Sequence, residues 1–133
     1  MPLLTFSLMW ESKLMDLSKR QTIRINSDLW RRRAGRPDMM TGESVRVEDS
    51  VLHIHLTNPR NRHPRHRKMG QSNGWELHLM RGEDFTEDIA LRDGFAGRQE
   101  LVKGLMELNG MTYNEVMAET WAVIRWEWRL GPN

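Results

Sequence analysis

The stretch SKRQTIR, Ser18–Arg24, surrounds one threonine with three cationic side chains. Its β-branched residues favour an extended backbone, in which Thr22 and Arg24 point to one side and Ile23 to the other. An ammonium and a guanidinium group beside a hydroxyl can hold an anion or a carbonyl oxygen, and a lysine withdrawn from water can act as a base. The stretch is therefore a candidate binding or catalytic site centred on Lys19. The alternative is a strand whose exposed face simply carries polar residues.

Positive charge is concentrated in two short segments, RRRAGR at 31–36 and RNRHPRHRK at 60–68. The net charge of the chain is only +2, so the remaining residues are acidic on balance. Clustered cations on an acidic body favour a polyanionic partner, because each phosphate contact releases counterions. The alternative is a pair of solvated loops without a ligand. The candidate nucleic-acid contacts are Arg31, Arg32, Arg33, Arg60, Arg62, Arg65, Arg67 and Lys68.

Other side chains support narrower hypotheses. Trp30 precedes the first arginine run and is placed to stack on a base, and the alternative is that it belongs to the core like the other tryptophans. His53 and His55 share one face of an expected strand, a spacing that can chelate a metal, but no third ligand is evident. The sequence shows no cluster of carboxylates of the kind that holds the metal ions of a nuclease. We therefore predict no metal and no cofactor.

Length and composition predict a single domain spanning residues 1–133. Hydrophobic residues make up 38% of the chain and charged residues 29%, which is not the composition of a disordered protein. No apolar run is long enough to span a membrane, and the first residues do not resemble a secretion signal. The absence of cysteine excludes disulfides and thiolate chemistry. We expect a cytoplasmic protein without a membrane partner, and its oligomeric state is not predicted.

Hydrophobic periodicity predicts the elements that must position these residues. Period-two alternation predicts strands at 3–8, 21–25, 44–48, 51–56, 75–80 and 121–128. Helical spacing, together with a capping box at Thr112 and Glu115, predicts helices at 10–17, 86–93, 101–108 and from 112 onward. The segments 26–41 and 57–74 are expected to be long basic loops, and 48–50 the turn of a hairpin. The expected core includes Leu17, Ile23, Ile25, Leu52, Ile54, Leu56, Trp75, Leu77 and Leu79. Five to six strands with short helices between them indicate an α+β fold or a partly closed barrel.

The order of four motifs gives a more specific indication. KRQTIR is followed about twenty residues later by TGESVRV, then by RDGF with a leucine-striped helix, and finally by AVIRWEW. This order resembles the ASCH family of PUA-like domains, over the chain from Leu4 to about Trp128. The resemblance implies a small PUA-like mixed β-barrel with a cleft beside the lysine and threonine segment. It also implies association with RNA or with modified nucleosides.

The resemblance further assigns roles to single residues. Some small ASCH members are amidohydrolases that remove the acyl group from N4-acetylcytidine, with a lysine, a threonine and a glutamate as the catalytic group. Lys19 and Thr22 match two of these positions, and Asp93 stands nearest to the third. Gln21, Arg24 and Trp30 are the expected ligand contacts beside the cleft, and the arginine-rich loops would hold phosphates.

Two functions therefore stay open, a binding module and an enzyme. The first binds nucleic acid or a modified nucleoside. The second hydrolyses an acylated cytidine, with Lys19 as base, Thr22 as nucleophile or water-orienting hydroxyl, and Asp93 as proton shuttle or lysine partner.

Overall fold

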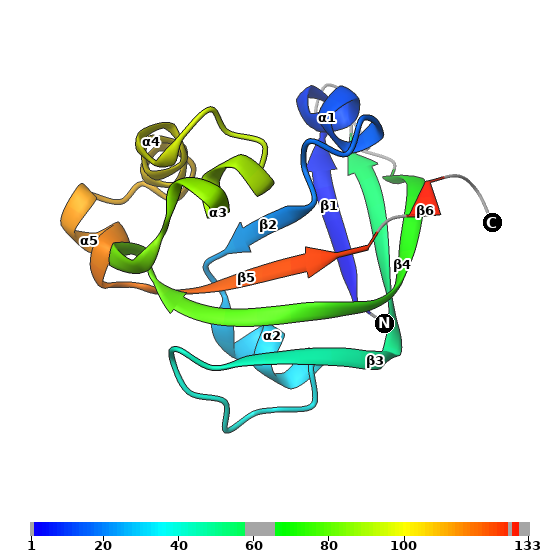
Figure 1. Ribbon diagram of the computed structural model, residues 1–133, viewed down its shortest axis with the longest axis horizontal. Helices are drawn as coiled ribbons and strands as arrows, with labels where there is room; N and C mark the ends of the chain where they lie inside the picture. Colours follow the sequence, from blue (N-terminus) through cyan, green and yellow to red (C-terminus); the bar gives the residue numbers. More distant parts are fainter. Residues whose placement is uncertain (1, 58–65, 128, 131–133) are drawn as a thin grey trace.

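The computed structural model of the chain describes residues 2–57, 66–127 and 129–130. It contains a six-stranded sheet with the order β1-β3-β4-β5-β2, and the short β6 pairs with β4 outside this path (Figure 1). The strands are β1 Leu3–Ser7, β2 Gln21–Arg24, β3 Ser44–Thr57, β4 His66–Arg81, β5 Thr120–Trp126 and β6 Arg129–Leu130. The helices are η1 Leu8–Trp10, α1 Glu11–Met15, α2 Ser27–Arg33, η2 Gly82–Asp84, α3 Glu87–Arg92, α4 Arg98–Asn109 and α5 Tyr113–Ala118.

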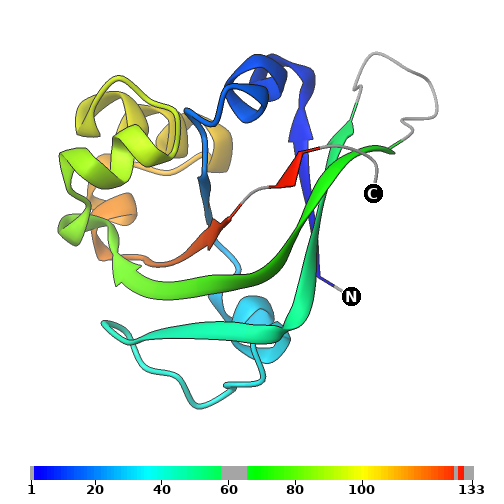
Figure 2. The same cartoon turned by 45° about the vertical axis from the view of Figure 1, so that its right-hand side comes forward.

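The sheet curls into half a barrel, which confirms the predicted α+β class and is consistent with a small PUA-like barrel with inserted helices (Figure 2). β1 runs parallel to β3, with Leu3 opposite His53, whereas the other strand pairs are antiparallel. β1 and β2 are the two ends of the strand order. We call the gap between these two edge strands the seam.

The helices lie in separate places around the sheet. α3, α4 and α5 form one group beside β2 and β5, whereas α1 lies apart from them at the end of β1 (Figure 1). α4 ends at Gly110, which adopts the left-handed conformation with φ +62°, and α5 begins with the predicted capping box of Thr112 and Glu115. None of the helices in the part of the chain that the structure describes is long and apolar enough to cross a membrane.

β3 and β4 form a long ribbon that bends at its middle (Figure 2). At the bend, residues 48–50 of β3 bulge out between two paired stretches of the ladder, opposite Gly74 of β4. Gly74 has φ +90°, and a Cβ there would lie 3.2 Å from the Val47 carbonyl oxygen, so the corner needs glycine. The prediction of a hairpin turn at 48–50 is wrong, because the strand continues through a bulge.

The predicted loop at 57–74 is also wrong over much of its length. β4 begins at His66, because β3 offers a continuous hydrogen-bonding partner that overrides the weak strand propensity of a polar sequence. Gly70 stands opposite Ile54 and Ser72 opposite Leu52, and both small residues are buried. Small residues at these inward positions leave room for the aliphatic side chains of β3.

The predicted loop at 26–41 contains the helix α2. Asn26 caps it, because its side-chain oxygen accepts a hydrogen bond from the Leu29 amide at 3.1 Å. Asp28 in the first turn and the arginines in the last turn suit the helix dipole. Trp30, which is 3% exposed, anchors the helix to the sheet.

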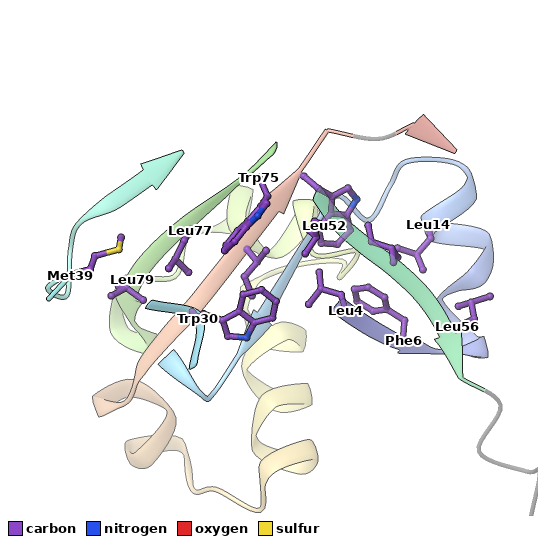
Figure 3. Packing of buried hydrophobic residues seen from close by; sticks show 14 residues of the cluster. Leu4, Phe6, Leu14, Trp30, Met39, Leu52, Leu56, Trp75, Leu77 and Leu79 are labelled. Carbon is purple, nitrogen blue, oxygen red and sulfur yellow. The ribbon is translucent and has the colours of Figure 1, made fainter. Parts of the chain in front are cut away.

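Buried apolar side chains cover both faces of the sheet. The first cluster fills the inside of the curl and contains the predicted core residues of β3 and β4, which are Leu52, Ile54, Leu56, Trp75, Leu77 and Leu79 (Figure 3). The second cluster joins Ile23, Trp121 and Val123 to the helices α3, α4 and α5. Leu17 and Ile25 are 44% and 41% exposed, so their predicted place in the core is wrong.

Candidate functional site

Lys19 and Asp93 form a buried ion pair between segments that are 74 residues apart in the sequence. The Lys19 Nζ lies 3.3 Å from Oδ2 of Asp93 and 2.8 Å from the Asp93 carbonyl oxygen. Only 2% of Lys19 and 4% of Asp93 is exposed. A backbone hydrogen bond of 2.9 Å from Arg20 to Arg92 holds the two segments together. The expected pairing of Lys19 with Asp93 is confirmed.

Gln21, which is fully buried, holds the other oxygen of the carboxylate. Its Nε2 donates to Oδ1 of Asp93 at 3.2 Å and to the Ile89 carbonyl oxygen at 3.0 Å. Its Oε1 accepts a hydrogen bond of 2.8 Å from Arg125 Nε. Both amide hydrogens of this expected ligand contact are therefore committed to the protein. Gln21 positions Asp93 on one side and Arg125 on the other.

Thr22 and Arg24 lie on one side of β2, as their alternation predicts. Arg24 donates from Nε to Oγ1 of Thr22 at 3.1 Å and from Nη2 to the Thr5 carbonyl oxygen at 2.9 Å. The second bond crosses the seam from β2 to β1, so Arg24 ties the two edge strands together. Thr22 is 5% exposed and Asp93 also acts electrostatically on Arg24. We call Lys19, Gln21, Thr22, Arg24 and Asp93 the Lys19 cluster.

Two aromatic rings form a wall of the Lys19 cluster. The Lys19 Nζ lies 4.3 Å from the ring centroid of Trp10 and 5.4 Å from that of Phe6. The guanidinium carbon of Arg24 lies 5.1 Å from the Phe6 centroid. Cations over aromatic faces are stabilised by the ring quadrupole, more strongly away from water. These contacts add to the ion pair in holding charge inside the protein.

The segment from Trp10 to Lys13 and the turn after α3 close over the cluster. The rings of Trp10 and Phe95 pack edge to face at 5.4 Å, and the Lys13 ammonium donates a hydrogen bond to the Gly94 carbonyl oxygen. Gly94 has φ +90°, and a Cβ there would lie 3.1 Å from Trp10 and 3.3 Å from the Cβ of Lys19. The Asp93-Gly94 turn thus needs glycine both for its backbone and for this close approach.

Burial brings the proton affinities of Lys19 and Asp93 closer together. Desolvation lowers the pKa of Lys19, and the attraction of Asp93 opposes this shift. Desolvation raises the pKa of Asp93, and the charge of Lys19 opposes that shift. Groups whose pKa values are perturbed in this way cluster at functional sites. For both groups, burial therefore favours the neutral form and the charge of the partner favours the ionised form.

The first arginine run is helical and is only partly available to a ligand. Arg31 donates from Nε to the Met39 carbonyl oxygen at 2.8 Å and pairs with Asp28, whereas Arg32 is exposed. Arg33 lies 4.7 Å from the ring centroid of Trp30. Trp30 itself is buried and packs edge to face on Trp75 at 5.6 Å. The expectation that Trp30 stacks on a base is corrected, because its ring belongs to the core.

The second arginine run is described only at its end. Arg60, Arg62 and Arg65 lie outside the described residues, as does the side chain of Arg67. Lys68 is exposed and its Nζ donates to the Gln71 Oε1 at 2.7 Å. Within residues 2–57, 66–127 and 129–130, no three histidine, aspartate or glutamate side chains are grouped as metal ligands.

No protein-family model matches the chain, and comparisons with curated proteins and with solved structures find no similar protein. The similarity to the ASCH family stays a prediction from the order of the motifs. The site itself brings together five residues that the sequence predicted, which are Lys19, Gln21, Thr22, Arg24 and Asp93. The sequence did not predict the wall of Phe6 and Trp10. Only the strand pairing and the path of α1 bring these rings to the lysine.

Proposed function

We propose that the protein binds a modified nucleoside, free or within RNA, at the Lys19 cluster. The observation that carries this proposal is a charge imbalance in a buried place. Lys19 and Arg24 are both cationic, and Asp93 is the carboxylate that acts on both. An uncompensated buried charge is costly, so a carbonyl oxygen or an anion is the natural additional partner.

The surroundings of the cluster suit a base. Trp10 is half-buried and offers an aromatic face, and Thr22 offers a hydroxyl whose oxygen already accepts a bond from Arg24. Stacking on an aromatic ring and hydrogen bonding to base edges are how proteins bind unpaired bases. Because Lys19, Thr22 and Asp93 are almost fully buried, ligand entry requires α1 to move away from the Asp93 turn.

The helix α2 and the segment around Lys68 extend the proposal to RNA. Arg32 and Lys68 are exposed, so they are available to phosphates along a strand. Binding through such contacts weakens with salt by a slope of about −0.7 per phosphate contact for single strands. The log of the affinity for an RNA oligonucleotide should therefore fall linearly with the log of the salt concentration. A salt-independent affinity would contradict this part of the proposal.

A hydrolytic activity is the second candidate, favoured by the converging pKa values of Lys19 and Asp93. A neutral Lys19 would take a proton from a water molecule oriented by Thr22 as that water attacks the acyl carbon of N4-acetylcytidine. Arg24, bound to the Thr22 hydroxyl, lies where it could stabilise the developing oxyanion. The bond between the acyl carbon and N4 breaks, and Lys19 returns the proton to N4. The products are cytidine and acetate.

The test incubates the protein with N4-acetylcytidine and a panel of modified nucleosides, measuring binding by calorimetry and products by mass. Lys19→Met should abolish both binding and turnover, and Asp93→Asn should remove turnover with less effect on binding. Thr22→Ser keeps a hydroxyl and should retain activity that Thr22→Val loses. Lys103→Met, on the exposed face of α4, is the matched control for a lost lysine. Unchanged binding and turnover in a folded Lys19→Met protein would refute the proposal.

A further inference from the structure

A hollow of about 340 Å³, lined mainly by charged residues, lies beside the segments that carry Lys19 and Asp93. Its charged lining consists of Arg20, Arg46, Glu76, Arg92, Arg125 and Glu127, which we call the arginine pocket. Four guanidinium groups thus meet two carboxylates. None of these residues belongs to the two arginine-rich segments of the sequence.

Strand register explains why three of these residues meet. Arg46 of β3 stands opposite Glu76 of β4, which stands opposite Arg125 of β5, so one row of side chains crosses three strands. Gln21 of β2 continues the row, opposite Arg125. Residues directly opposite each other across neighbouring strands share a face of the sheet. The row places Arg125 between Glu76 and Gln21.

Arg20 and Arg92 add the remaining cations from outside the row. Arg20 follows Lys19 in the sequence, and Arg92 precedes Asp93. A backbone hydrogen bond of 2.9 Å joins Arg20 to Arg92. Lys19 and Asp93 turn into the buried cluster, whereas Arg20 and Arg92 line the pocket. Cluster and pocket are thus two sides of one pair of segments, and Gln21 connects them through Asp93 and Arg125.

The protein satisfies the guanidinium groups of the pocket to different extents. Arg46 pairs through Nε with Glu48 and through Nη1 with Glu127, both at 3.7 Å. Arg125 uses Nε for Gln21, and Arg92 uses Nε for Asp88 at 2.9 Å. Arg20 is exposed and makes no side-chain hydrogen bond or ion pair within the described residues. Desolvation lowers the pKa of Arg125, and the nearby charge of Arg92 lowers it further. An anion that accepts hydrogen bonds from Arg20, Arg92 and Arg125 would reduce the repulsion between these guanidinium groups.

We propose that the arginine pocket binds the phosphate group of a nucleotide or of RNA. The inference rests on the proposed function and narrows its ligand class to phosphorylated nucleosides or RNA. Arginine suits this role, because its planar fork donates paired hydrogen bonds to phosphate oxygens. The hollow also lies within the size range of small-ligand sites, about 300 to 1,000 Å³.

The test compares cytidine, its 5′- and 3′-monophosphates and inorganic phosphate by calorimetry on the full chain, with N4-acetylcytidine as a further nucleoside. One monophosphate should bind at least roughly tenfold more tightly than cytidine, the gain expected from one charge-assisted contact. Arg20→Met should remove that advantage while leaving the nucleoside affinity unchanged. Arg81→Met, an exposed arginine near the end of β4, is the matched control and should change neither.

Glu76→Gln tests the site in the opposite direction. It removes a carboxylate that competes with phosphate for the arginines, so the monophosphate should bind roughly two- to threefold more tightly. Equal affinity of nucleotide and nucleoside in the parent protein, or equal effects of Arg20→Met and Arg81→Met, would overturn the inference. If nucleosides fail to bind but inorganic phosphate binds the parent protein and not Arg20→Met, the phosphate site stands and the proposed function alone fails.

Discussion

Gln21 connects the Lys19 cluster to the arginine pocket, but the two sites hold charge in opposite ways. In the cluster Lys19 and Asp93 are almost fully buried and Arg24 is half-buried, and hydrogen bonds, an ion pair and aromatic rings fix their positions. In the pocket the guanidinium groups of Arg20 and Arg46 are exposed, and the arginines outnumber the carboxylates. The cluster therefore depends on its internal partners, whereas the pocket keeps its charge hydrated and available. The difference predicts that variants of the cluster change stability strongly and variants at the pocket rim change it little.

The largest effect is expected from breaking the buried pair. Lys19→Met or Asp93→Asn leaves one buried charge without its partner, which typically costs about 3 to 5 kcal/mol of the free energy of unfolding. Urea denaturation measures this loss. The double variant should lose less than the sum of the single variants, because neither charge is then left alone.

The two single variants should also differ in the sign of their pH dependence. In Lys19→Met, burial raises the pKa of Asp93 in the folded state, so the folded protein binds more protons and stability falls as the pH rises above the ordinary pKa of a carboxyl group. In Asp93→Asn, burial lowers the pKa of Lys19 in the folded state, so the folded protein binds fewer protons and stability rises as the pH rises toward the ordinary pKa of lysine. The exposed controls Lys103→Met and Asp84→Asn should each stay within about 0.5 kcal/mol at every pH. Parallel pH curves for the two cluster variants would show that the pair is not electrostatically coupled.

A second test separates close packing at the cluster from backbone strain. Gly94 and Gly42 have φ values of +90° and +94°, but only at Gly94 would a Cβ meet neighbours, at Trp10 and Lys19. Both alanine variants incur the cost of a left-handed backbone, roughly 1 to 2 kcal/mol. Gly94→Ala should lose at least about 1 kcal/mol more than Gly42→Ala, because it also overpacks the cluster. Equal losses in urea unfolding would mean that Trp10 moves aside freely, and that the cover over Lys19 is loose.

The smallest effect concerns the rim of the arginine pocket. Leu17 lines the pocket and has φ +68°, an unfavourable conformation for a residue with a Cβ. Leu17→Gly should therefore raise the free energy of unfolding by about 0.5 kcal/mol, after the entropic cost of glycine is subtracted. Denaturant midpoints measured at matched pH provide the comparison. A loss of stability would show that the Leu17 side chain contributes packing that outweighs its backbone strain.

The sequence predicts those parts of the fold that local patterns determine. The strands that carry Leu52, Ile54 and Leu77 follow from alternation, and the start of α5 follows from the capping box at Thr112. The helix α2 was missed although Asn26 is a good cap, because the arginines around it suggested a solvated loop. The second half of the ribbon was missed because its polar residues are strand only through their pairing with β3.

The site was predicted unevenly for a similar reason. Lys19, Thr22 and Arg24 lie within one short stretch, and Asp93 was added only by the resemblance to a family. The arginine pocket requires Arg46, Glu76 and Arg125 to stand in register. The register between distant strands cannot be predicted from the sequence of any single strand. A side-chain row across three strands can be recognised only once the order and alignment of the strands are known.

The parallel pairing of β1 has a consequence for how the chain folds. β1 is near the start of the chain, yet its only strand partner in the described sheet is β3, fifty residues later, so its ladder closes a long loop. Contacts between residues so far apart in the sequence form late, because closing the loop costs chain entropy before the stabilising contacts have formed. During synthesis β1 must therefore wait unpaired until β3 has emerged. We expect the Lys19 cluster, whose Phe6 wall and Thr5 acceptor both belong to β1, to be completed only in the last step of folding.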